Sequence, residues 1–307
     1  MRNFLEAEKY RMLREKMDSY VSGGIAVAFS GGVDSALLLK LACMAAGEEN
    51  AVYAVTVQTR LHPANDLETA KRMAVKFGAA HRVLQIDELA ESGLENNPVD
   101  RCYLCKRSIF RKIKDLTHTL GVEHILEGTN ADDLGEYRPG IRAVRELGVS
   151  SPLAECGLTK AEIRELAGHL GISAAKRPSA PCLATRLPYG TKIDYALLGR
   201  IDEGERYLRE LGFYNVRLRV HELTELVSEK REEQGSCCEN GAGSAEEDPG
   251  REWLARIEVD REDLGKILEN REELVRKIKK LGFARVTMDL EGFRSGSMDE
   301  RQSRLRG

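Results

Sequence analysis

The segment IAVAFSGGVDS, residues 25–35, decides the fold. Its first five residues are continuously apolar, which is typical of a strand buried on both faces of a parallel sheet. Residues 36–44 then predict a helix. Two glycines between strand and helix let the backbone bend, so that successive amides and the helix N-terminus point at one anion. The loop lacks the Gly-Lys-Ser/Thr of a Walker A motif and the spaced glycines of a dinucleotide fingerprint. The candidate phosphate-binding residues are Ser30, Gly31, Gly32, Asp34 and Ser35, with Asp34 also a candidate magnesium contact.

Outward from this segment, strands and helices alternate along the first half of the chain. A helix at 5–20 precedes the first strand, and further strands are predicted at 52–57, 82–86 and 124–127. Helices are predicted at 66–77 and 104–120, and a capping box, Thr159 with Glu162, opens another that stops at Gly171. This alternation predicts an α/β fold with a doubly wound parallel sheet and helices on both faces.

A second, smaller α/β unit is predicted after a Pro-containing stretch at 177–182. Its predicted elements are a helix at 195–211, strands at 216–220, 255–259 and 284–290, and a helix at 262–280. The expected domains are 1–190 and 191–307. The segment at about 222–252 is rich in Glu, Gly and Ser, so a flexible insertion is expected there, with Cys237 and Cys238 inside it.

Composition narrows the function classes. The 307 residues carry 47 basic and 50 acidic side chains, a formal charge of −3, which gives no support to a nucleic-acid partner. Neither a membrane-spanning apolar run nor the hydrophobic core of a signal peptide is evident, so a cytoplasmic protein is expected. In that compartment the seven cysteines are not expected to form structural disulfides, and clustered cysteines suggest metal or thiol chemistry.

A polar loop at 127–140 follows the strand at 124–127. Ligands of open parallel sheets bind beyond the carboxyl ends of the strands, so this loop and the glycine-rich loop can face the same nucleotide. Asp132 and Asp133 are candidate magnesium ligands, and Arg138 is a candidate phosphate ligand; a solvated loop is the alternative. The candidate nucleotide-binding residues of this loop are Gly128, Thr129, Asn130, Asp132, Asp133 and Arg138.

Three cysteines are candidates for chemistry. Cys102 and Cys105 form a Cys-x-x-Cys pair at a helix start among basic residues, whose positive potential would favour thiolates. The pair alone would also suit a redox site or half of a zinc site, and Cys182, between Pro181 and Leu183, would also suit a packing role. Taken together, three cysteines with no obvious fourth suit a 4Fe-4S cluster with one open iron. Cys43 and Cys156 are expected to pack.

Alternating basic residues mark the second unit. Arg217, Arg219 and His221 alternate on one strand and therefore share a face, where they could clamp a phosphate or a carboxylate. The alternative is an exposed strand face carrying ordinary surface charge.

The hexapeptide at 30–35 resembles the PP-loop of the ATP pyrophosphatase superfamily, whose members cleave ATP between the α- and β-phosphates. Together with residues 128–133, 138–140, 177–184, 188–191, 255–259 and 289–297, it resembles the LarE family over nearly the whole chain. This resemblance implies an ATP- and Mg²⁺-dependent sulfur transferase that makes the precursor of the nickel-pincer nucleotide cofactor of lactate racemase. A carboxylate of pyridinium-3,5-biscarboxylic acid mononucleotide is adenylated, sulfur displaces AMP, and repetition gives the bisthiocarboxylic product.

The family has two branches that differ in their sulfur source. In one, the cysteine matched here by Cys182 is consumed; in the other, three cysteines hold a 4Fe-4S cluster. The presence of Cys102 and Cys105 beside Cys182 resembles the cluster branch. The resemblance also implies that Arg217 and Arg219 bind substrate and that the chain forms a hexamer, a dimer of trimers. Alternatives are a cluster-dependent tRNA thiolase, a sacrificial Cys182, and a cluster-binding carrier without catalysis.

Overall fold

The computed structural model describes residues 8–48, 50–62, 66–135, 138–172, 181–223 and 251–294. The chain divides into two compact units, residues 1–182 and 183–307. The assignment of adenylation to the first unit and of substrate binding to the second stays a prediction. Among the described helices, none combines the length and the apolar character needed to cross a bilayer.

The first unit is built on a four-stranded sheet with the order β3-β2-β1-β4. Its strands are β1 (Ile25–Ala28), β2 (Val52–Gln58), β3 (Ala80–Gln85) and β4 (His124–Leu126). All three pairings are parallel, so every strand ends at the same edge. The predicted parallel sheet is therefore confirmed, and the loops that follow its four strands share one edge.

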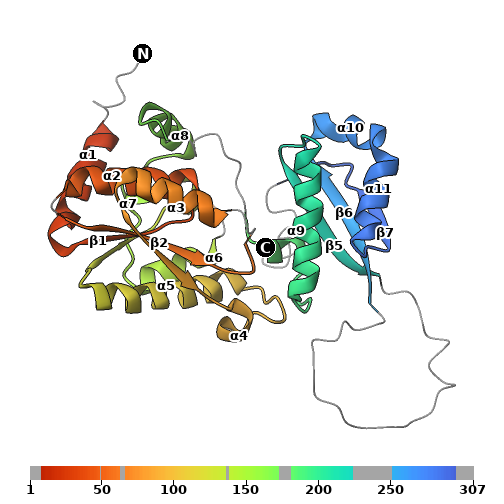
Figure 1. The fold of residues 1–307 in the computed structure, drawn as a ribbon, viewed down its shortest axis with the longest axis horizontal. Helices are drawn as coiled ribbons and strands as arrows, with labels where there is room; N and C mark the ends of the chain where they lie inside the picture. Colours follow the sequence, from red (N-terminus) through yellow and green to blue (C-terminus); the bar gives the residue numbers. More distant parts are fainter. Residues whose placement is uncertain are drawn as a thin grey trace, which may run out of the picture. The chain divides into compact units, whose positions relative to one another are not determined.

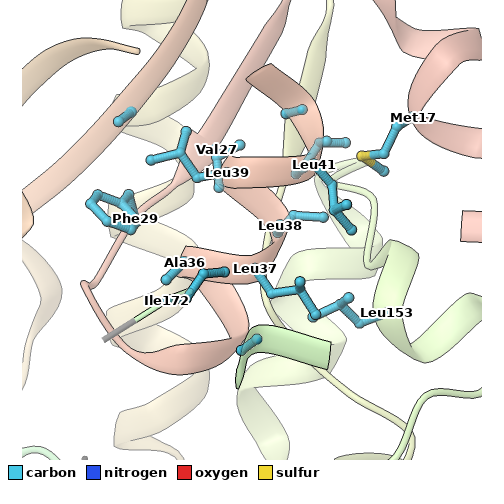
Figure 2. Close-up of a cluster of buried hydrophobic side chains, with 14 of the residues drawn as sticks. Met17, Val27, Phe29, Ala36, Leu37, Leu38, Leu39, Leu41, Leu153 and Ile172 are labelled. Atoms are coloured by element: carbon cyan, nitrogen blue, oxygen red, sulfur yellow. The ribbon is translucent and has the colours of Figure 1, made fainter. Parts of the chain in front are cut away.

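Helices cover both faces of this sheet (Figure 1). They are α1 (Glu8–Tyr20), α2 (Val33–Ala46), α3 (Asp66–Phe77), α4 (Glu88–Ser92), α5 (Arg101–Leu120), α6 (Pro139–Glu146), α7 (Pro152–Glu155) and α8 (Lys160–His169). Val27 and Phe29 pack in the core with α1, α2 and α8, whereas Ala26 packs on the other face with Phe110 and Ile113 of α5. Figure 2 shows part of the first core, in which Val27 and leucines of α2 belong to one buried cluster. Burial on both faces explains why the strand reads as an unbroken apolar run.

Several local features of the first unit differ from the sequence prediction. The helix α5 begins at Arg101 rather than at about 104, because its first turn carries no apolar periodicity. The short helices α4 and α6 were not predicted, and α6 lies within and beyond the predicted polar loop. Pro139 lies in the first turn of α6, where proline is common, and is the sequence signal for this helix.

The second unit is a three-stranded sheet with helices. Its elements are η5 (Leu183–Arg186), α9 (Tyr195–Glu210), β5 (Val216–Leu223), β6 (Glu252–Val259), η6 (Arg261–Asp263), α10 (Leu264–Glu269), α11 (Arg271–Lys280) and β7 (Arg285–Met288). The sheet order is β5-β6-β7, with β5 antiparallel and β7 parallel to β6. The single helix predicted at 262–280 is wrong: it divides at Asn270, whose side-chain amide donates to the carbonyl of Lys266 at 2.8 Å. The ends of the insertion predicted at about 222–252 belong to strands instead, since β5 continues to Leu223 and β6 begins at Glu252. The rest of the predicted insertion, residues 224–250 with Cys237 and Cys238, lies outside the described residues.

Candidate functional site

The loop between β1 and α2 has the geometry of an anion cradle. Gly31 adopts a φ of +75°, a conformation that side chains with a Cβ rarely adopt. The Ser30 and Ser35 hydroxyls lie 3.2 Å apart, and Ser30 Oγ accepts from the Gly32 amide at 3.3 Å. No side chain caps the start of α2 at Gly32, so its first amides remain available to a ligand. The loop places the five predicted phosphate-binding residues around one helix N-terminus.

The loop after β4 approaches this cradle closely. A Cβ added to Gly128 would lie 3.1 Å from both the Asp34 Cβ and the Ser35 amide nitrogen. Asn130 is 3% exposed, and its side-chain amide lies 3.5 Å from an oxygen of Asp34. The prediction that these two loops meet at one edge of the sheet is confirmed, and a side chain at position 128 would press against Asp34 and the first turn of α2.

Lys160 is a residue of this site that the sequence reading missed. Its ammonium group contacts the Asp34 carboxylate, and its backbone amide donates to Asp132 at 2.8 Å. Asn130 helps to fix Asp132, because its side-chain oxygen accepts a hydrogen bond from the Asp132 amide at 3.0 Å. The sequence did contain one signal for Lys160. The capping box of Thr159 and Glu162 starts α8 here and places Lys160 at the first helical position. Asp34, Asn130, Asp132 and Lys160 therefore form one polar cluster beside the cradle.

The two aspartates predicted to serve magnesium are held by different groups. Asp133 accepts from the Asn130 amide at 3.1 Å and pairs with Arg138 at 2.9 Å. Arg138 is exposed, and its pairing with Asp133 places it at the rim of the loop rather than in the cradle. Magnesium typically takes one or two carboxylates together with substrate phosphates. The Lys160 ammonium group contacts Asp34 and its backbone amide donates to Asp132, so both carboxylates lie beside the cradle, whereas Asp133 pairs with Arg138 at the rim. Asp34 and Asp132 are therefore the preferred candidates for magnesium.

Lys160→Met is expected to lower the kcat/KM for ATP-dependent pyrophosphate release by about 10²-fold, because one fixed cation near the developing phosphate charge is lost. A pyrophosphate-release assay checks this. Lys9→Met is the matched control. Lys9 pairs at 2.9 Å with Glu162, which lies on α8 as Lys160 does, but Lys9 itself is exposed and lies away from Asp34. Equal losses in both variants would assign the effect to α8 stability instead.

The cysteines predicted to act together lie in the first unit and share one electrostatic neighbourhood. Cys102 and Cys105 lie in the first turns of α5; Cys102 is exposed, whereas Cys105 and Cys182 are partly buried. Burial raises the pKa of the Cys105 thiol, and nearby Cys182, Glu88 and Cys102 raise it further. We refer to Cys102, Cys105 and Cys182 as the three-cysteine site. In the described part of the chain, no three His, Cys, Asp or Glu side chains converge as the ligands of a single ion would.

The expectation that basic neighbours make Cys105 a thiolate is wrong. Lys106 lowers the pKa of Cys105 only slightly, because its ammonium group points to Glu127 at 3.5 Å. The Arg107 guanidinium lies 5.2 Å from the centre of the Tyr103 ring. Residues that are adjacent in a helix face different directions, so charge near a cysteine in sequence does not supply charge at its sulfur.

The cysteines expected to pack do so. Cys156 is buried in the core with Leu153, and Cys43 packs against the same core from α2. Burial raises the pKa of Cys43 to about 11 and that of Cys156 above its usual value. Both thiols therefore stay protonated at neutral pH and are poor nucleophiles.

The arginine pair of the second unit lies in the interior rather than on an exposed strand face. Arg217 and Arg219 on β5 are 8% and 4% exposed. Arg219 donates to Glu258 at 3.1 Å and to the Thr185 carbonyl at 2.7 Å. The Arg217 guanidinium lies 5.0 Å from the centre of the Phe293 ring, and burial, followed by the charge of Arg186, lowers its pKa to about 10. His221, the third predicted member, has its pKa lowered by burial and by Arg256.

A buried ion pair that the sequence reading missed supports this arginine pair. Arg186 and Glu205 are 1% and 0% exposed and form a two-point contact at 2.7 and 2.8 Å. Glu205 also accepts from Arg209 at 2.7 Å and from the Leu218 amide at 3.0 Å. Because Leu218 lies between the two arginines of β5, this carboxylate fixes the strand that presents them.

Comparison with known proteins bears on both units. A family model described as NAD synthase matches residues 6–129. The pyridinium-3,5-bisthiocarboxylic acid mononucleotide synthase of Lactiplantibacillus plantarum is 31% identical over 276 residues, 90% of this chain and 89% of that protein. An uncharacterized protein of Synechocystis is 37% identical over 275 residues, 89% of this chain and 91% of that protein. The tRNA-specific 2-thiouridylase MnmA of Rickettsia felis is 28% identical over 197 residues, but covers only 51% of this chain and 52% of the enzyme.

Proposed function

This chain belongs to the family of the pyridinium-3,5-bisthiocarboxylic acid mononucleotide synthase, the LarE family, and from that premise we propose that it thiolates pyridinium-3,5-biscarboxylic acid mononucleotide. It is an ATP-dependent adenylating sulfurtransferase with a PP-loop. In the proposed reaction, a substrate carboxylate oxygen attacks the α-phosphorus of ATP and pyrophosphate leaves. Sulfur then attacks the resulting acyl adenylate and AMP leaves, and a second cycle completes the bisthiocarboxylic precursor of the nickel-pincer nucleotide.

The PP-loop geometry is the observation that carries the adenylation step. The open amides at the start of α2 and the hydroxyls of Ser30 and Ser35 would hold the phosphates. Mg²⁺, when bound with ATP, would neutralise part of the phosphate charge in the transition state. Asp34 and Asp132 would contact it, and Lys160 would add a fixed positive charge beside them. Arg217 and Arg219 would bind the substrate phosphate or the transferring sulfur.

The three-cysteine site supports cluster-dependent sulfur delivery. Three thiols in one neighbourhood are a soft donor set that suits an iron–sulfur cluster, and each ligand of such a cluster binds a different iron, so the thiols stand further apart than the ligands of one ion. A 4Fe-4S cluster held there would supply a transferable sulfide, so that the chain could turn over repeatedly.

The proposed reaction is tested with the full chain, ATP, Mg²⁺ and the pyridinium dicarboxylate. We expect pyrophosphate release that depends on the dicarboxylate, together with a nucleotide product in which oxygen is replaced by sulfur. Mass spectrometry of the protein separates the two sulfur sources: loss of hydrogen sulfide from Cys182 would identify a sacrificial cysteine, whereas an unchanged chain with thiolated product supports the cluster.

The second candidate function is thiolation of tRNA, which the partial similarity to MnmA favours. It is tested by offering the chain tRNA in place of the pyridinium dicarboxylate. We expect no thiolation of tRNA at moderate salt, because the chain carries a net charge of −3. Thiolated tRNA would overturn the small-nucleotide proposal. Pyrophosphate release without any thiolated product, even after anaerobic reconstitution, would identify a chain that adenylates but does not transfer sulfur. The hexameric assembly is a further proposal, which light scattering tests.

A further inference from the structure

A buried hydroxyl group lies next to the start of the PP-loop, on the neighbouring strand. Thr56 of β2 is 6% exposed, and its hydroxyl donates a hydrogen bond to the Phe29 carbonyl at 2.8 Å. Phe29 is the last residue before the loop, and its amide donates to the Val55 carbonyl of β2 at 2.8 Å. A buried hydroxyl is costly unless it is hydrogen-bonded, and a valine would fill the same space without that cost. The hydroxyl at position 56 therefore indicates a specific task at this end of β1.

The imidazole of His81, on β3, fixes the direction of this hydroxyl. Burial, followed by the charge of Lys71, lowers the pKa of His81, so the ring is neutral at neutral pH. Its Nε2 atom lies 2.8 Å from the Thr56 hydroxyl oxygen. A hydroxyl has one proton and the Phe29 carbonyl can only accept it, so the Thr56 oxygen must accept from His81. The hydrogen-bond network thus assigns the single proton of the neutral ring to Nε2.

The peptide between Phe29 and Ser30 transmits this arrangement to the phosphate-binding loop. In a planar trans peptide, the carbonyl and the amide N–H point in opposite directions. Thr56 holds the carbonyl on the β2 side, and β1 lies between β2 and β4, so the Ser30 N–H points toward the β4 side. The loop after β4 approaches the cradle on that side, where Gly128 lies next to Asp34. Ser30 is exposed and no described residue accepts a hydrogen bond from its amide, which is therefore available to an anion in the cradle.

We propose that His81 and Thr56 are positioning residues of the PP-loop, which aim the Ser30 amide at a phosphate of bound ATP. This inference rests on the proposed function through nucleotide binding at the PP-loop, and it is independent of the sulfur source. His81 holds the Thr56 hydroxyl, and the hydroxyl holds the Phe29 carbonyl. The peptide plane then directs the Ser30 N–H, so neither side chain needs to touch ATP. An amide that is fixed in advance needs no reorganisation when charge develops on the phosphates, which is the physical advantage of this arrangement.

The test measures the binding of MgATP to the full chain by isothermal titration calorimetry, without the second substrate. Thr56→Val removes the central hydroxyl, and we expect the Kd for ATP to rise about 10-fold, because one hydrogen bond to a charged phosphate is weakened. The fitted stoichiometry should stay that of the wild type, since the remaining donors of the loop are intact. Thr56→Ser keeps the hydroxyl and should restore the affinity of the wild type.

The outer residue of the pair is tested in the same way. His81→Phe removes the N–H donor and frees the Thr56 hydroxyl to turn away from Phe29, so the Kd for ATP is expected to rise about threefold. His81→Gln should restore the affinity, because the glutamine amide nitrogen lies as many bonds along the side chain as Nε2. Thr117→Val is the matched control. Thr117 is 3% exposed and its hydroxyl also donates to a backbone carbonyl, that of Lys114 at 3.0 Å, but it lies on α5, and its variant should bind ATP as the wild type does.

The remaining outcomes separate this role from a purely structural one. Affinities of Thr56→Val and His81→Phe equal to that of the wild type would overturn the positioning role and leave the proposed function intact. A lower stoichiometry at an unchanged Kd would show that the substitutions only reduce the folded fraction, and would also overturn it. Failure of Thr56→Ser and His81→Gln to restore binding would do the same. A wild type that binds no ATP would contradict the proposed function itself, and the positioning role with it.

Discussion

A Cys182→Ala variant is expected to release pyrophosphate from ATP and to form no thiolated product. Whether Cys182 donates its own sulfur or holds the centre that does, thiolation loses its sulfur source, and we expect a fall of at least about 10³-fold. Adenylation should continue, because the cradle at 30–35 and the polar cluster around Asp34 make no use of this cysteine. Separate assays of pyrophosphate and of the thiolated nucleotide check the two steps.

Cys43→Ala is the matched control for that variant. Cys43 lies on α2, the helix that follows the PP-loop, but it packs against the core and burial raises its pKa to about 11. It should therefore keep both activities. Thiolated product from Cys182→Ala at the rate of the wild type would contradict the assignment, and loss of pyrophosphate release in the same variant would show that the cysteine also supports adenylation.

The features that the sequence predicted best are those with a repeated local signal. The strand at 25–29 was recognisable because burial on both faces removes polar residues from every position. The PP-loop was recognisable because an anion cradle needs glycine and hydroxyl residues at a strand-to-helix turn. By contrast, α4 has only five residues, too few to show helical periodicity, and Asn270 divides a segment that reads as one amphipathic helix.

The features that the sequence could not predict are pairings between distant residues. Lys160 and Asp34 are 126 positions apart, and only the fold brings them together. Burial of a charged residue is equally invisible in one sequence, because Glu88, Arg186 and Glu205 look like ordinary surface residues of helices and turns. The direction of a side chain also escaped prediction, since Lys106 is adjacent to Cys105 but turns to Glu127. Residue type indicated the chemistry, whereas partners and burial required the three-dimensional arrangement.

Glu205→Ala is expected to cause the largest loss of stability in the second unit. The substitution leaves Arg186, which is 1% exposed, as an uncompensated buried charge, and also removes the partner of the Leu218 amide. Breaking a buried pair in this way typically costs about 3–5 kcal/mol of unfolding free energy. Chemical denaturation followed by circular dichroism measures this loss. Because β5 carries Arg217 and Arg219, we expect substrate affinity to fall together with stability.

The control is Glu203, which lies on α9 as Glu205 does. It forms a partly exposed pair with Lys277 of α11 at 3.0 Å. Glu203→Ala should cost no more than about 1 kcal/mol of unfolding free energy.

Acid titration provides a second test of the role of Glu205. Burial alone would raise the pKa of Glu205, but the hydrogen bond and charge of Arg186 outweigh it and hold the pKa below the usual 4.5. The stability from this carboxylate is therefore complete above pH 4.5 and is lost as the pH falls through the lower, folded-state pKa. The stability difference between wild type and Glu205→Ala should narrow over that acidic range; a constant difference would show that packing, not charge, is the contribution of Glu205.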